Sequence, residues 1–578
     1  MIRYLLFALL AAALAAGVFL FTRDRGYPAD EHSLAQGEQL FSLNCSSCHA
    51  LESEGFGPPL GGVTELFSEK SLIQFIKNPS KAIESGEERA TKLHERYKQI
   101  MPPFERLADA EIRNILSYIH SQTELHHILP FSMDNGTEVK GLTGRLVDPV
   151  IRSGLKIELE EVVQIPRLPG SSPDLGIVTL RPHPAANGVV FVSDQNGYIY
   201  RIHNGKAEVF LDARKHIPDF QSGPGIATGI ASFEFHPDFL QNGLFYMLHA
   251  ETFKGKIADY SVLVDTFKSE VQWVVAEWKM DNVNDSLFRG THRELLRLHA
   301  PTFGHGAQDM GFIPGLKKGD PEYGLLYFGF GDGGANNIKH PEIGHRLTAF
   351  LGSIMRIDPA GNNSKNGKYG IPVSNPFVNE TDPLTVKEIY AYGFRNPHRF
   401  SWDQTHNNRM IASDIGEANI EEVNVIEKGG DYGWPSREGT YGITTTRDLK
   451  TVYQLPEIDR KLYKLPFAQF DHEEGNAISG GYVYDGDLTQ LKDKYIFGDI
   501  VSGRLFFVNV DPMMTDSSVY ELSIFQDGKE TSLREMSQTK RIHLRIGYDR
   551  FAKQLYVITK VDGKIYRVSN AAKISEAN

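Results

Sequence analysis

Six short β-rich runs recur in the C-terminal part of the chain, and they limit the possible folds more than any other feature. They begin at Val190, Leu244, Leu326, Met410, Tyr495 and Leu555. The runs divide about 415 residues into units of about 70, the scale of a repeated four-stranded sheet. The first and last runs also resemble each other, as expected if the two ends of the array meet. The sequence therefore predicts a mainly β fold with a six-bladed β-propeller; an elongated array of β-sandwiches is the alternative.

The composition agrees with this fold and excludes one class of partner. The 578 residues include 54 glycines and 11% aromatic residues, which indicates many turns and many short strands. Lys and Arg number 61 against 73 Asp and Glu, a formal net charge of −12. A nucleic-acid-binding surface usually has the opposite sign, so we expect no nucleic-acid partner.

One long apolar run lies near the N-terminus. Tyr4 to Phe21 is uninterrupted by charge, between Arg3 and Arg23. Eighteen helical residues would span about 27 Å, which is enough for the hydrocarbon core of a membrane. We expect residues 1–30 to be an apolar helix that anchors the protein, and a cleaved signal peptide is the alternative. Either interpretation places the rest of the chain on the exported, periplasmic side.

Both cysteines of the chain lie in one short motif, Cys45-Ser46-Ser47-Cys48-His49. Residues i and i+3 share a face of a helical turn, so Cys45 and Cys48 can both form thioethers with haem vinyl groups. His49 can then bind the iron as an axial ligand. A redox dithiol or half of a zinc site is the alternative, although the first does not need His49 and the second needs further ligands.

A sixth iron ligand is expected some fifty residues later. Met101 precedes two prolines, which suit a ligand loop, and a helix is predicted over 109–121 from its apolar spacing. The layout of residues 31–125 resembles a small all-α class I cytochrome c domain. We therefore predict covalent haem c with His49 and Met101 on the iron. A linker over 126–154 then leads to the propeller, residues 155–572.

Motifs within the predicted propeller resemble those of the glucose/sorbosone dehydrogenase family. They occur in family order at 236–243, 331–334, 392–397, 414–424, 429–435 and 478–484. In enzymatic members of that family, pyrroloquinoline quinone (PQQ) lies on the propeller axis and calcium polarises it. A histidine removes the proton of a substrate hydroxyl while hydride passes to the quinone.

The resemblance implies roles for particular residues. His305 corresponds to the catalytic histidine, and Arg541 and Arg545 lie near the place of the arginines that bind the quinone carboxylates. The sequence departs from soluble glucose dehydrogenases at Ala227, Gly304 and Ala335, where those enzymes have Gln, an acid and Arg. We therefore expect a substrate larger or less polar than glucose.

Several acids on one predicted loop suggest a calcium site. Calcium prefers clustered oxygen ligands, and carboxylates in close proximity repel one another unless a cation or arginines intervene. The candidate ligands are Asp414, Glu417, Glu421 and Glu422. Solvated loop acids are the alternative interpretation.

These features together suggest an exported quinohaemoprotein dehydrogenase. A propeller that oxidises a sugar or alcohol with PQQ would pass electrons singly to the fused haem, and then to a downstream cytochrome or another respiratory acceptor. Two other functions stay open. One is a non-catalytic propeller that binds a protein or carbohydrate, and the other is a hydrolase or lactonase on a calcium propeller.

Overall fold

The computed structural model describes residues 26–46, 48–97, 100–131, 141–167, 176–185, 188–223, 228–262, 264, 269–443, 451–560 and 562–574. The chain divides into two compact units, Met1–Thr137 and Glu138–Asn578. The predicted apolar helix at Tyr4–Phe21 lies outside the described residues. Within the described ranges, no helix has both the length and the apolar character needed to cross a membrane.

The described part of the first unit is helical, as predicted. Its helices are α2 (Glu31–Asn44), α3 (Val63–Leu66), α4 (Glu69–Lys77), α5 (Pro79–Glu84), α6 (Glu88–Tyr97) and α7 (Asp109–His126). Helix α2 begins where the Asp30 carboxylate accepts a hydrogen bond from the Ser33 N–H at 2.9 Å. It crosses α7 at Gly37, where a Cβ atom would lie 2.0 Å from the Asn114 carbonyl oxygen. This close crossing orders the chain that leads into Cys45.

The second unit is mainly β, also as predicted. Its first three sheets contain β2 (Ile177–Pro182), β3 (Val190–Asp194), β4 (Tyr198–His203) and β5 (Lys206–Asp212); β6 (Ile230–Phe235), β7 (Leu244–Thr252), β8 (Tyr260–Ser261), β9 (Val271–Met280) and β10 (Gly290–His299); and β11 (Ala307–Gly311), β12 (Leu326–Phe330), β13 (Ser353–Ile357) and β14 (Ile389–Tyr392). Short helices η1 (Ala213–Lys215), α8 (Phe239–Asn242) and η2 (Pro341–His345) lie in their connections.

The remaining sheets complete the unit. They contain β15 (Pro397–Asp403), β16 (Arg409–Asp414), β17 (Ile420–Ile426) and β21 (Ala468–Asp471); the small sheet β18 (Arg437–Glu438), β19 (Tyr441–Ile443) and β20 (Val452–Tyr453); and β22 (Tyr482–Tyr484), β23 (Lys494–Gly498), β24 (Leu505–Asn509), β25 (Tyr520–Gln526), β26 (Lys529–Thr531), β27 (Leu544–Asp549), β28 (Gln554–Thr559), β29 (Lys564–Lys573) and β1 (Ile151–Gln164). Helices α9 (Glu457–Arg460) and α10 (Leu533–Ser537) are short.

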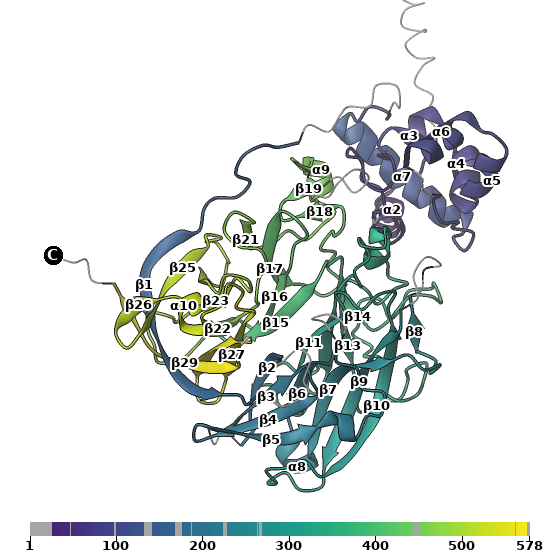
Figure 1. Ribbon diagram of the computed structural model, residues 1–578. Coiled ribbons are helices and arrows are strands. Elements are labelled where there is room, and N and C mark those ends of the chain that lie inside the picture. The colour runs from purple at the N-terminus through teal and green to yellow at the C-terminus, as the bar shows by residue number, and fades with distance from the viewer. Residues whose placement is uncertain are drawn as a thin grey trace, which may run out of the picture. The chain divides into compact units, whose positions relative to one another are not determined.

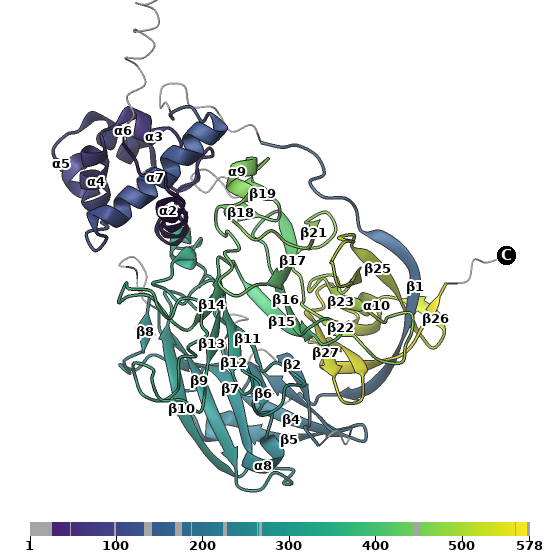
Figure 2. The same ribbon diagram turned by 180° about the vertical axis from the view of Figure 1, so that it is seen from behind.

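The first strands of the successive sheets close a ring. Strand β2 contacts β6, β6 contacts β11, β11 contacts β15, β15 contacts β22, β22 contacts β27, and β27 returns to β2. Figures 1 and 2 show these strands gathered in the middle of the unit, with β5, β10 and β25 farther out. A closed ring of antiparallel sheets is the arrangement of a β-propeller.

Each of the six recurring runs forms the second strand of its blade. The strands concerned are β3, β7, β12, β16, β23 and β28. Each pairs antiparallel with the innermost strand before it, so the end of every run lies beside the start of an innermost strand. The repeated runs of the sequence therefore form the equivalent strand, second from the axis, in every blade.

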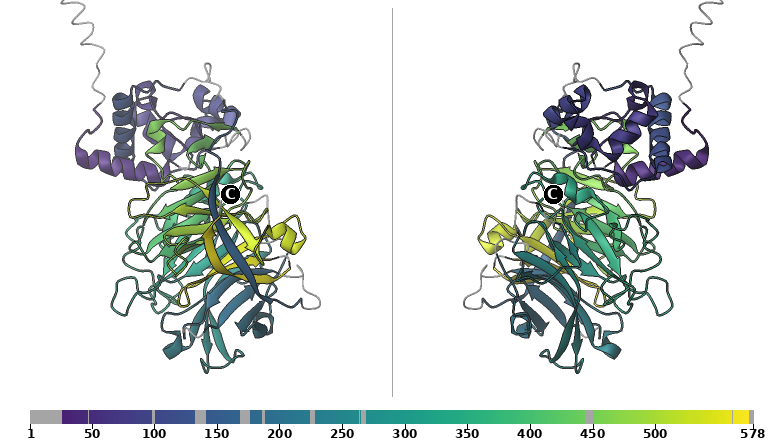
Figure 3. Two further views of the ribbon diagram at one scale, coloured as in Figure 1. Left: turned by 90° about the vertical axis from the view of Figure 1, so that its left-hand side faces the viewer. Right: turned by 90° about the vertical axis from the view of Figure 1, so that its right-hand side faces the viewer.

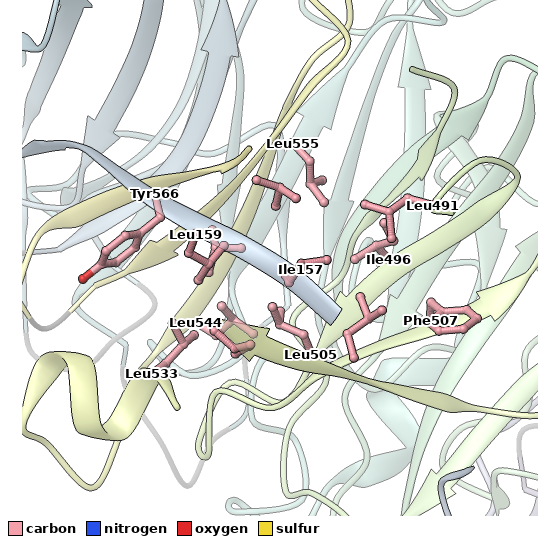
Figure 4. Close-up of a cluster of buried hydrophobic side chains, with 14 of the residues drawn as sticks. Ile157, Leu159, Leu491, Ile496, Leu505, Phe507, Leu533, Leu544, Leu555 and Tyr566 are labelled. Carbon is pink, nitrogen blue, oxygen red and sulfur yellow. The ribbon is translucent and has the colours of Figure 1, made fainter. Parts of the chain in front are cut away.

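The ring is closed by a strand from the start of the unit. Strand β1 pairs antiparallel with β29 and parallel with β25, so it joins the last two blades. Figure 3 shows this blue strand beside the yellow C-terminal strands. Its alternate residues Leu155, Ile157 and Leu159 are buried, as the period of a strand requires. Figure 4 shows Ile157 and Leu159 within the apolar cluster of these blades. β1 begins at Ile151, inside the predicted linker.

The ring of innermost strands has two ends, which we call the first and second mouths of its central channel. The first mouth is the end where the innermost strands begin, near Ala307 and Leu544. The second mouth is the end where they finish, near Pro182 and Gly311. Five residues of β11 separate the two mouths, about 13 Å at about 3.3 Å per residue.

Candidate active site and haem-attachment segment

The Cys45–His49 segment folds as a single turn after α2. The N–H groups of Cys48 and His49 donate to the Cys45 carbonyl at 3.0 and 2.9 Å. Neither cysteine is in a disulfide, and both are partly buried. Burial and the neighbouring Cys48 raise the pKa of Cys45 to about 12, so its thiol is protonated in the protein without haem. The turn places both thiols within one short segment, as thioether attachment to one porphyrin requires.

The His49 ring is oriented by a backbone contact. Its Nδ1 lies 2.8 Å from the Pro58 carbonyl oxygen and donates to it when that nitrogen carries the proton. Nε2 is then left as the atom that can bind a metal, which is the usual arrangement of a ligating histidine. Gly57 is required beside the ring, because a Cβ there would lie 2.2 Å from His49 Cε1. These residues fit a covalently attached haem.

Met101 lies in the loop before α7 and is partly buried. Its role as the sixth iron ligand stays a prediction. The zinc alternative gains no support, since the described ranges contain no group of three or more His, Cys, Asp or Glu able to hold a metal ion.

His305 forms the centre of the candidate site at the first mouth. Its Nδ1 lies 2.7 Å from Oδ1 of Asp332, and the other carboxylate oxygen accepts a hydrogen bond from Trp434 Nε1 at 3.1 Å. Asp332 follows β12 and is fully buried, whereas a quarter of the His305 side chain is exposed. The carboxylate thus orients the imidazole from its buried side and leaves Nε2 on the open side.

The backbone at His305 adopts an unusual conformation. Its φ is +42°, in the left-handed region that non-glycine residues rarely occupy. The segment is packed against Gly331, where a Cβ would lie 2.5 Å from the His305 carbonyl oxygen. Strain of this kind persists when the surroundings dictate it, and it is common at functional sites.

The groups around Asp332 keep it ionised. Burial by itself raises the pKa of this carboxyl, but the nearby His305 and Arg395 reverse the effect, and the net pKa is lowered. Arg395 is also buried and lies over the Trp434 ring, 5.7 Å from the ring centroid. The site therefore contains a permanent anion behind a histidine, as a proton-accepting imidazole requires.

A cluster of cations lies beside this dyad. Arg399 donates to the carbonyl of Gln308, three residues after His305, and Arg545 and Lys560 lie close to Arg399. Burial and the charge of Arg399 lower the pKa of Arg545 to about 9. Burial, Arg545 and Arg399 lower the pKa of Lys560 well below its usual value. Such shifts are typical of buried like charges held close together.

Few carboxylates compensate this cluster. Lys560 donates to the Gln195 side chain, and Arg545 donates to the backbone carbonyl of Leu544. The Nε atom of Arg545 is buried, and the described residues give it no hydrogen-bond partner. Asp309 lies 3.9 Å from Arg399, but it also pairs with Arg181 at 2.8 Å. The arrangement fits an anionic ligand in the channel.

The structure supports only part of the predicted quinone contacts. Arg545 belongs to the buried cationic cluster, but Arg541 is exposed and forms no ion pair within the described ranges. Sequence reasoning missed Arg399 and Lys560. Arg399 follows the 392–397 motif by two residues, a signal that could have been used, whereas Lys560 follows β28 without any motif.

The four predicted calcium ligands do not form one cluster. Asp414 and Glu422 lie opposite each other on the paired strands β16 and β17, and burial together with Glu422 raises the pKa of Asp414, but each of the four acids also has its own hydrogen-bond partners. Asp414 accepts hydrogen bonds from the backbone N–H groups of Arg395 and Asn396 at 3.1 and 2.6 Å. Glu417 instead binds the Arg395 guanidinium, with Nε at 2.8 Å. Both acids are therefore used to hold the loop that follows β14.

The other two acids have separate basic partners. Glu421 accepts from His472 at 2.9 Å, and Glu422 accepts from Arg437 at 2.8 Å. The sequence leaves open whether a metal ion or basic side chains separate these carboxylates. In the structure their partners are arginines and a histidine. These four carboxylates do not fit a calcium cage in this structure.

The three departures from soluble glucose dehydrogenases differ in their surroundings. Ala227 lies outside the described residues. Ala335 is fully buried after Asp332. Gly304 has space around it, because a Cβ there would meet only ordinary contacts, at 3.4 Å from Thr302 Oγ1 and 3.8 Å from Gly334 Cα. The residue before His305 therefore lacks a side chain although the structure has room for one.

The ring of sheets, the dyad at its first mouth and the Cys45–His49 turn define a β-propeller protein with an N-terminal cytochrome c domain. The chain belongs to the glucose/sorbosone dehydrogenase family, whose model matches residues 180–567. The cytochrome c family model matches residues 34–123. Both resemblances noted in the sequence are confirmed.

Curated relatives include proteins with and without an enzymatic name. HIPL1 protein of Arabidopsis thaliana is 25% identical over 444 residues, covering 67% of this chain and 60% of that protein. Quinoprotein glucose dehydrogenase B of Acinetobacter calcoaceticus is 25% identical over 336 residues, covering 54% and 62% respectively. The matched regions thus span less than two thirds of either relative.

A solved structure gives the same picture of the fold. A crystallised glucose dehydrogenase superposes with a TM-score of 0.50 at 16% sequence identity, covering 68% of this chain and 96% of that one. This similarity shows the fold of the second unit.

Proposed function

We propose that the protein is an exported quinohaemoprotein dehydrogenase that oxidises a sugar or alcohol hydroxyl and delivers the electrons to its own haem c. The observation on which this proposal depends most is the buried cationic cluster beside His305. A fold alone does not define an activity in this family, because its members include proteins with different names. The site supports an oxidoreductase more than a simple binding surface.

The cluster suits PQQ, which has three carboxylates. Arg399, Arg545 and Lys560 supply buried donors whose mutual repulsion an anion would relieve. When bound, PQQ supplies a two-electron acceptor for the substrate. The chain's own contribution is to bind and orient that group at the first mouth and to keep water from the buried donors.

His305 and Asp332 would handle the substrate proton. The open Nε2 of His305 can accept a hydroxyl proton, while Asp332 holds Nδ1 and balances the charge that develops on the ring. Trp434 fixes the second oxygen of Asp332 and so limits rotation of the carboxylate.

The cytochrome domain supplies the one-electron outlet. A reduced two-electron centre must be reoxidised by an acceptor, and a haem fused to the same chain accepts single electrons. We further propose a downstream cytochrome or respiratory acceptor as the next partner. Export with an anchor at Tyr4–Phe21 fits this role, and N-terminal sequencing of the mature protein distinguishes the anchor from a cleaved signal peptide.

A second function is favoured by one observation. HIPL1 protein and human hedgehog-interacting protein match this chain at 25% identity each, and neither name denotes an enzyme. A propeller that binds a protein or carbohydrate through the first mouth is therefore the alternative. The hydrolase reading loses its basis, since the predicted calcium ligands have other partners.

Reconstitution of the purified full-length protein tests the main proposal. PQQ is added first without substrate, and binding is followed by calorimetry; candidate sugars and alcohols are then added while haem reduction is monitored. We expect PQQ binding in the micromolar range and haem reduction by at least one substrate. If PQQ fails to bind, the enzyme proposal is wrong and the binding propeller replaces it. A Lys560→Met variant tests the cluster in the same assay, because it removes one of its cations and leaves His305 intact; it should bind PQQ more weakly.

A further inference from the structure

A second histidine–carboxylate pair is buried next to the His305–Asp332 dyad, and the proposed oxidation gives it no role. Nε2 of His345, at the end of η2, lies 2.7 Å from Oδ1 of Asp431. The His345 side chain is fully buried, and that of Asp431 is 6% exposed. Nδ1 of the histidine and Oδ2 of the aspartate are buried and have no hydrogen-bond partner among the described residues. The two side chains therefore hold each other, because a buried carboxylate that loses its side-chain donor is costly.

This pair joins two segments that both touch Asp332, and the first of them is η2. A Cβ on Gly344, the residue before His345, would lie 2.9 Å from Cβ of Asp332. The same Cβ would lie 3.9 Å from Cδ1 of Trp434. The backbone of η2 is therefore packed against the dyad carboxylate and against its indole donor.

The second segment is the connection between β17 and β18. The Gly433 N–H donates to Oδ1 of Asp431 at 2.9 Å, and the Trp434 N–H donates to the Gly393 carbonyl at 2.8 Å. Gly393 has a φ of +80°, and a Cβ there would lie 2.6 Å from the same Asp431 oxygen. Asp431 thus fixes a turn that ends at Trp434, whose Nε1 donates to Oδ2 of Asp332 at 3.1 Å.

The indole has a distinct part in holding Asp332. Oδ1 of this carboxylate is already shared by His305 at 2.7 Å and the Gly334 N–H at 2.9 Å, so Trp434 is the donor on Oδ2. A donor on the second oxygen limits rotation of the carboxylate and takes up part of its negative charge. The position of the indole therefore affects how firmly Asp332 orients the imidazole, and small displacements at such a site lower the rate strongly.

We propose that His345 and Asp431 are positioning residues for the dyad and that they act through the indole of Trp434. By fixing the turn that ends at Trp434, they keep its N–H on Oδ2 of Asp332 and so keep His305 oriented. This role belongs to the proposed oxidation and rests on it. The pair itself does not touch the substrate.

Fluorine NMR of the full-length protein labelled with 5-fluorotryptophan tests this role without PQQ and without turnover. The chain has four tryptophans, and Trp434→Phe assigns the resonance of interest. His345→Leu removes the donor to Asp431 and should shift or broaden the Trp434 resonance. His345→Gln can place an amide N–H near the position of Nε2 and should restore most of the wild-type signal.

Steady-state kinetics of the PQQ-loaded protein provide the functional measurement. His345→Leu should lower kcat about tenfold and leave KM within about twofold, because the change disturbs orientation rather than substrate binding. The acid limb of the kcat/KM profile should move to higher pH, since a carboxylate that loses a donor stabilises the protonated imidazole more. Arg395 also faces Asp332 and is unchanged in these variants. A His345→Leu/Trp434→Phe double variant should be no slower than Trp434→Phe alone, because both changes remove the same contact.

His406→Leu is the matched control, because it breaks a histidine–aspartate pair at the second mouth. Nδ1 of His406 lies 2.9 Å from Oδ2 of Asp403, which is fully buried. The Trp434 resonance and the pH profile of this variant should equal those of the wild type. Thermal unfolding checks that each variant is folded. If His345→Leu does not fold, Asp431→Asn replaces it, since an amide still accepts from Gly433 but has no charge to hold the histidine.

An unchanged Trp434 resonance in the folded His345→Leu protein would overturn the proposal. A double variant in which the two losses of kcat multiply would also overturn it, since the two residues would then act independently. Absence of turnover in the wild type contradicts the proposed function instead, and the fluorine spectra still decide whether His345 holds the indole.

Discussion

The Nδ1 atom of His305 lies 2.7 Å from Oδ1 of Asp332, although 26 residues separate the two in the chain. Two neighbouring segments bring them together, because His305 precedes β11 and Asp332 follows the antiparallel β12. The carboxylate is buried and its pKa is lowered on balance, since its interactions with His305 and Arg395 outweigh burial. The pair thus presents a histidine whose orientation is fixed from inside the blade.

This geometry predicts different effects for changes at the two residues. His305→Ala should lower turnover by roughly 10²–10⁴-fold and leave PQQ binding nearly unchanged, because a positioned base contributes about that factor. Asp332→Asn should lower kcat by about tenfold or more with little change in KM, since an amide orients the imidazole less firmly than the carboxylate does. Steady-state kinetics with calorimetric measurement of PQQ affinity check both. Loss of PQQ binding in His305→Ala would show that the residue is a ligand rather than a base.

The cationic cluster predicts a pH dependence of PQQ affinity. The pKa of Lys560 is lowered and that of Arg545 falls to about 9 in the free protein, so both lose protons at lower pH than usual. A bound anion favours the protonated forms, and binding should therefore take up protons. Affinity should fall as the pH rises through the lowered pKa values. Calorimetry in buffers of different ionisation enthalpy measures the uptake.

Lys560→Met provides the corresponding variant. It should weaken PQQ binding by about tenfold and reduce the proton uptake, because a charge-assisted contact is lost. A Lys560→Met protein with unchanged affinity and unchanged proton uptake would contradict a role for the cluster.

The haem segment predicts a distinct spectroscopic change. Met101→Ala should open the sixth iron position, abolish the near-infrared sulfur-to-iron band and allow carbon monoxide to bind reduced haem. Met513→Ala is the matched control, since Met513 is 80% exposed in the second unit. A band that persists in Met101→Ala shows that another residue is the ligand.

The open surroundings of Gly304 predict a change in substrate preference. Gly304→Asp restores the acid that soluble glucose dehydrogenases have before the histidine, and the structure leaves room for its Cβ. We expect kcat/KM for glucose to rise relative to that for a simple alcohol, because an acid can accept a sugar hydroxyl. Gly304→Ala fills the same space without the carboxylate and should give no such rise. An identical response in both variants would argue against the restored contact.

The burial of β1 predicts that truncating one of its side chains lowers the free energy of unfolding strongly. Ile157 on β1 is 1% exposed within the apolar cluster of Figure 4, and Ile157→Ala should cost about 2–5 kcal/mol of unfolding free energy. Ile151 on the same strand is 45% exposed, so Ile151→Ala should change stability by at most about 0.5 kcal/mol. Denaturant unfolding of the two variants measures the difference. Equal effects would mean that β1 does not close the ring.

Local sequence patterns were enough to predict the fold class, the haem-attachment segment and the family of this protein. The spacing of Cys45, Cys48 and His49 predicts haem attachment because the chemistry needs residues within a single turn. The six recurring runs predict a ring of repeated sheets because each run forms an equivalent strand. Motif order led to the family and to His305, and these predictions depend on residues near one another in the chain.

Only the tertiary structure decided which distant residues meet. Asp332 becomes the partner of His305 through strand pairing, and Lys560 joins Arg399 through closure of the ring, neither of which leaves a mark in the local sequence. The same limit explains the calcium prediction: Glu421 and Glu422 are adjacent in the chain, but alternate residues of a strand face opposite ways. One therefore meets His472 and the other Arg437, and proximity in sequence did not become proximity of carboxylates in space.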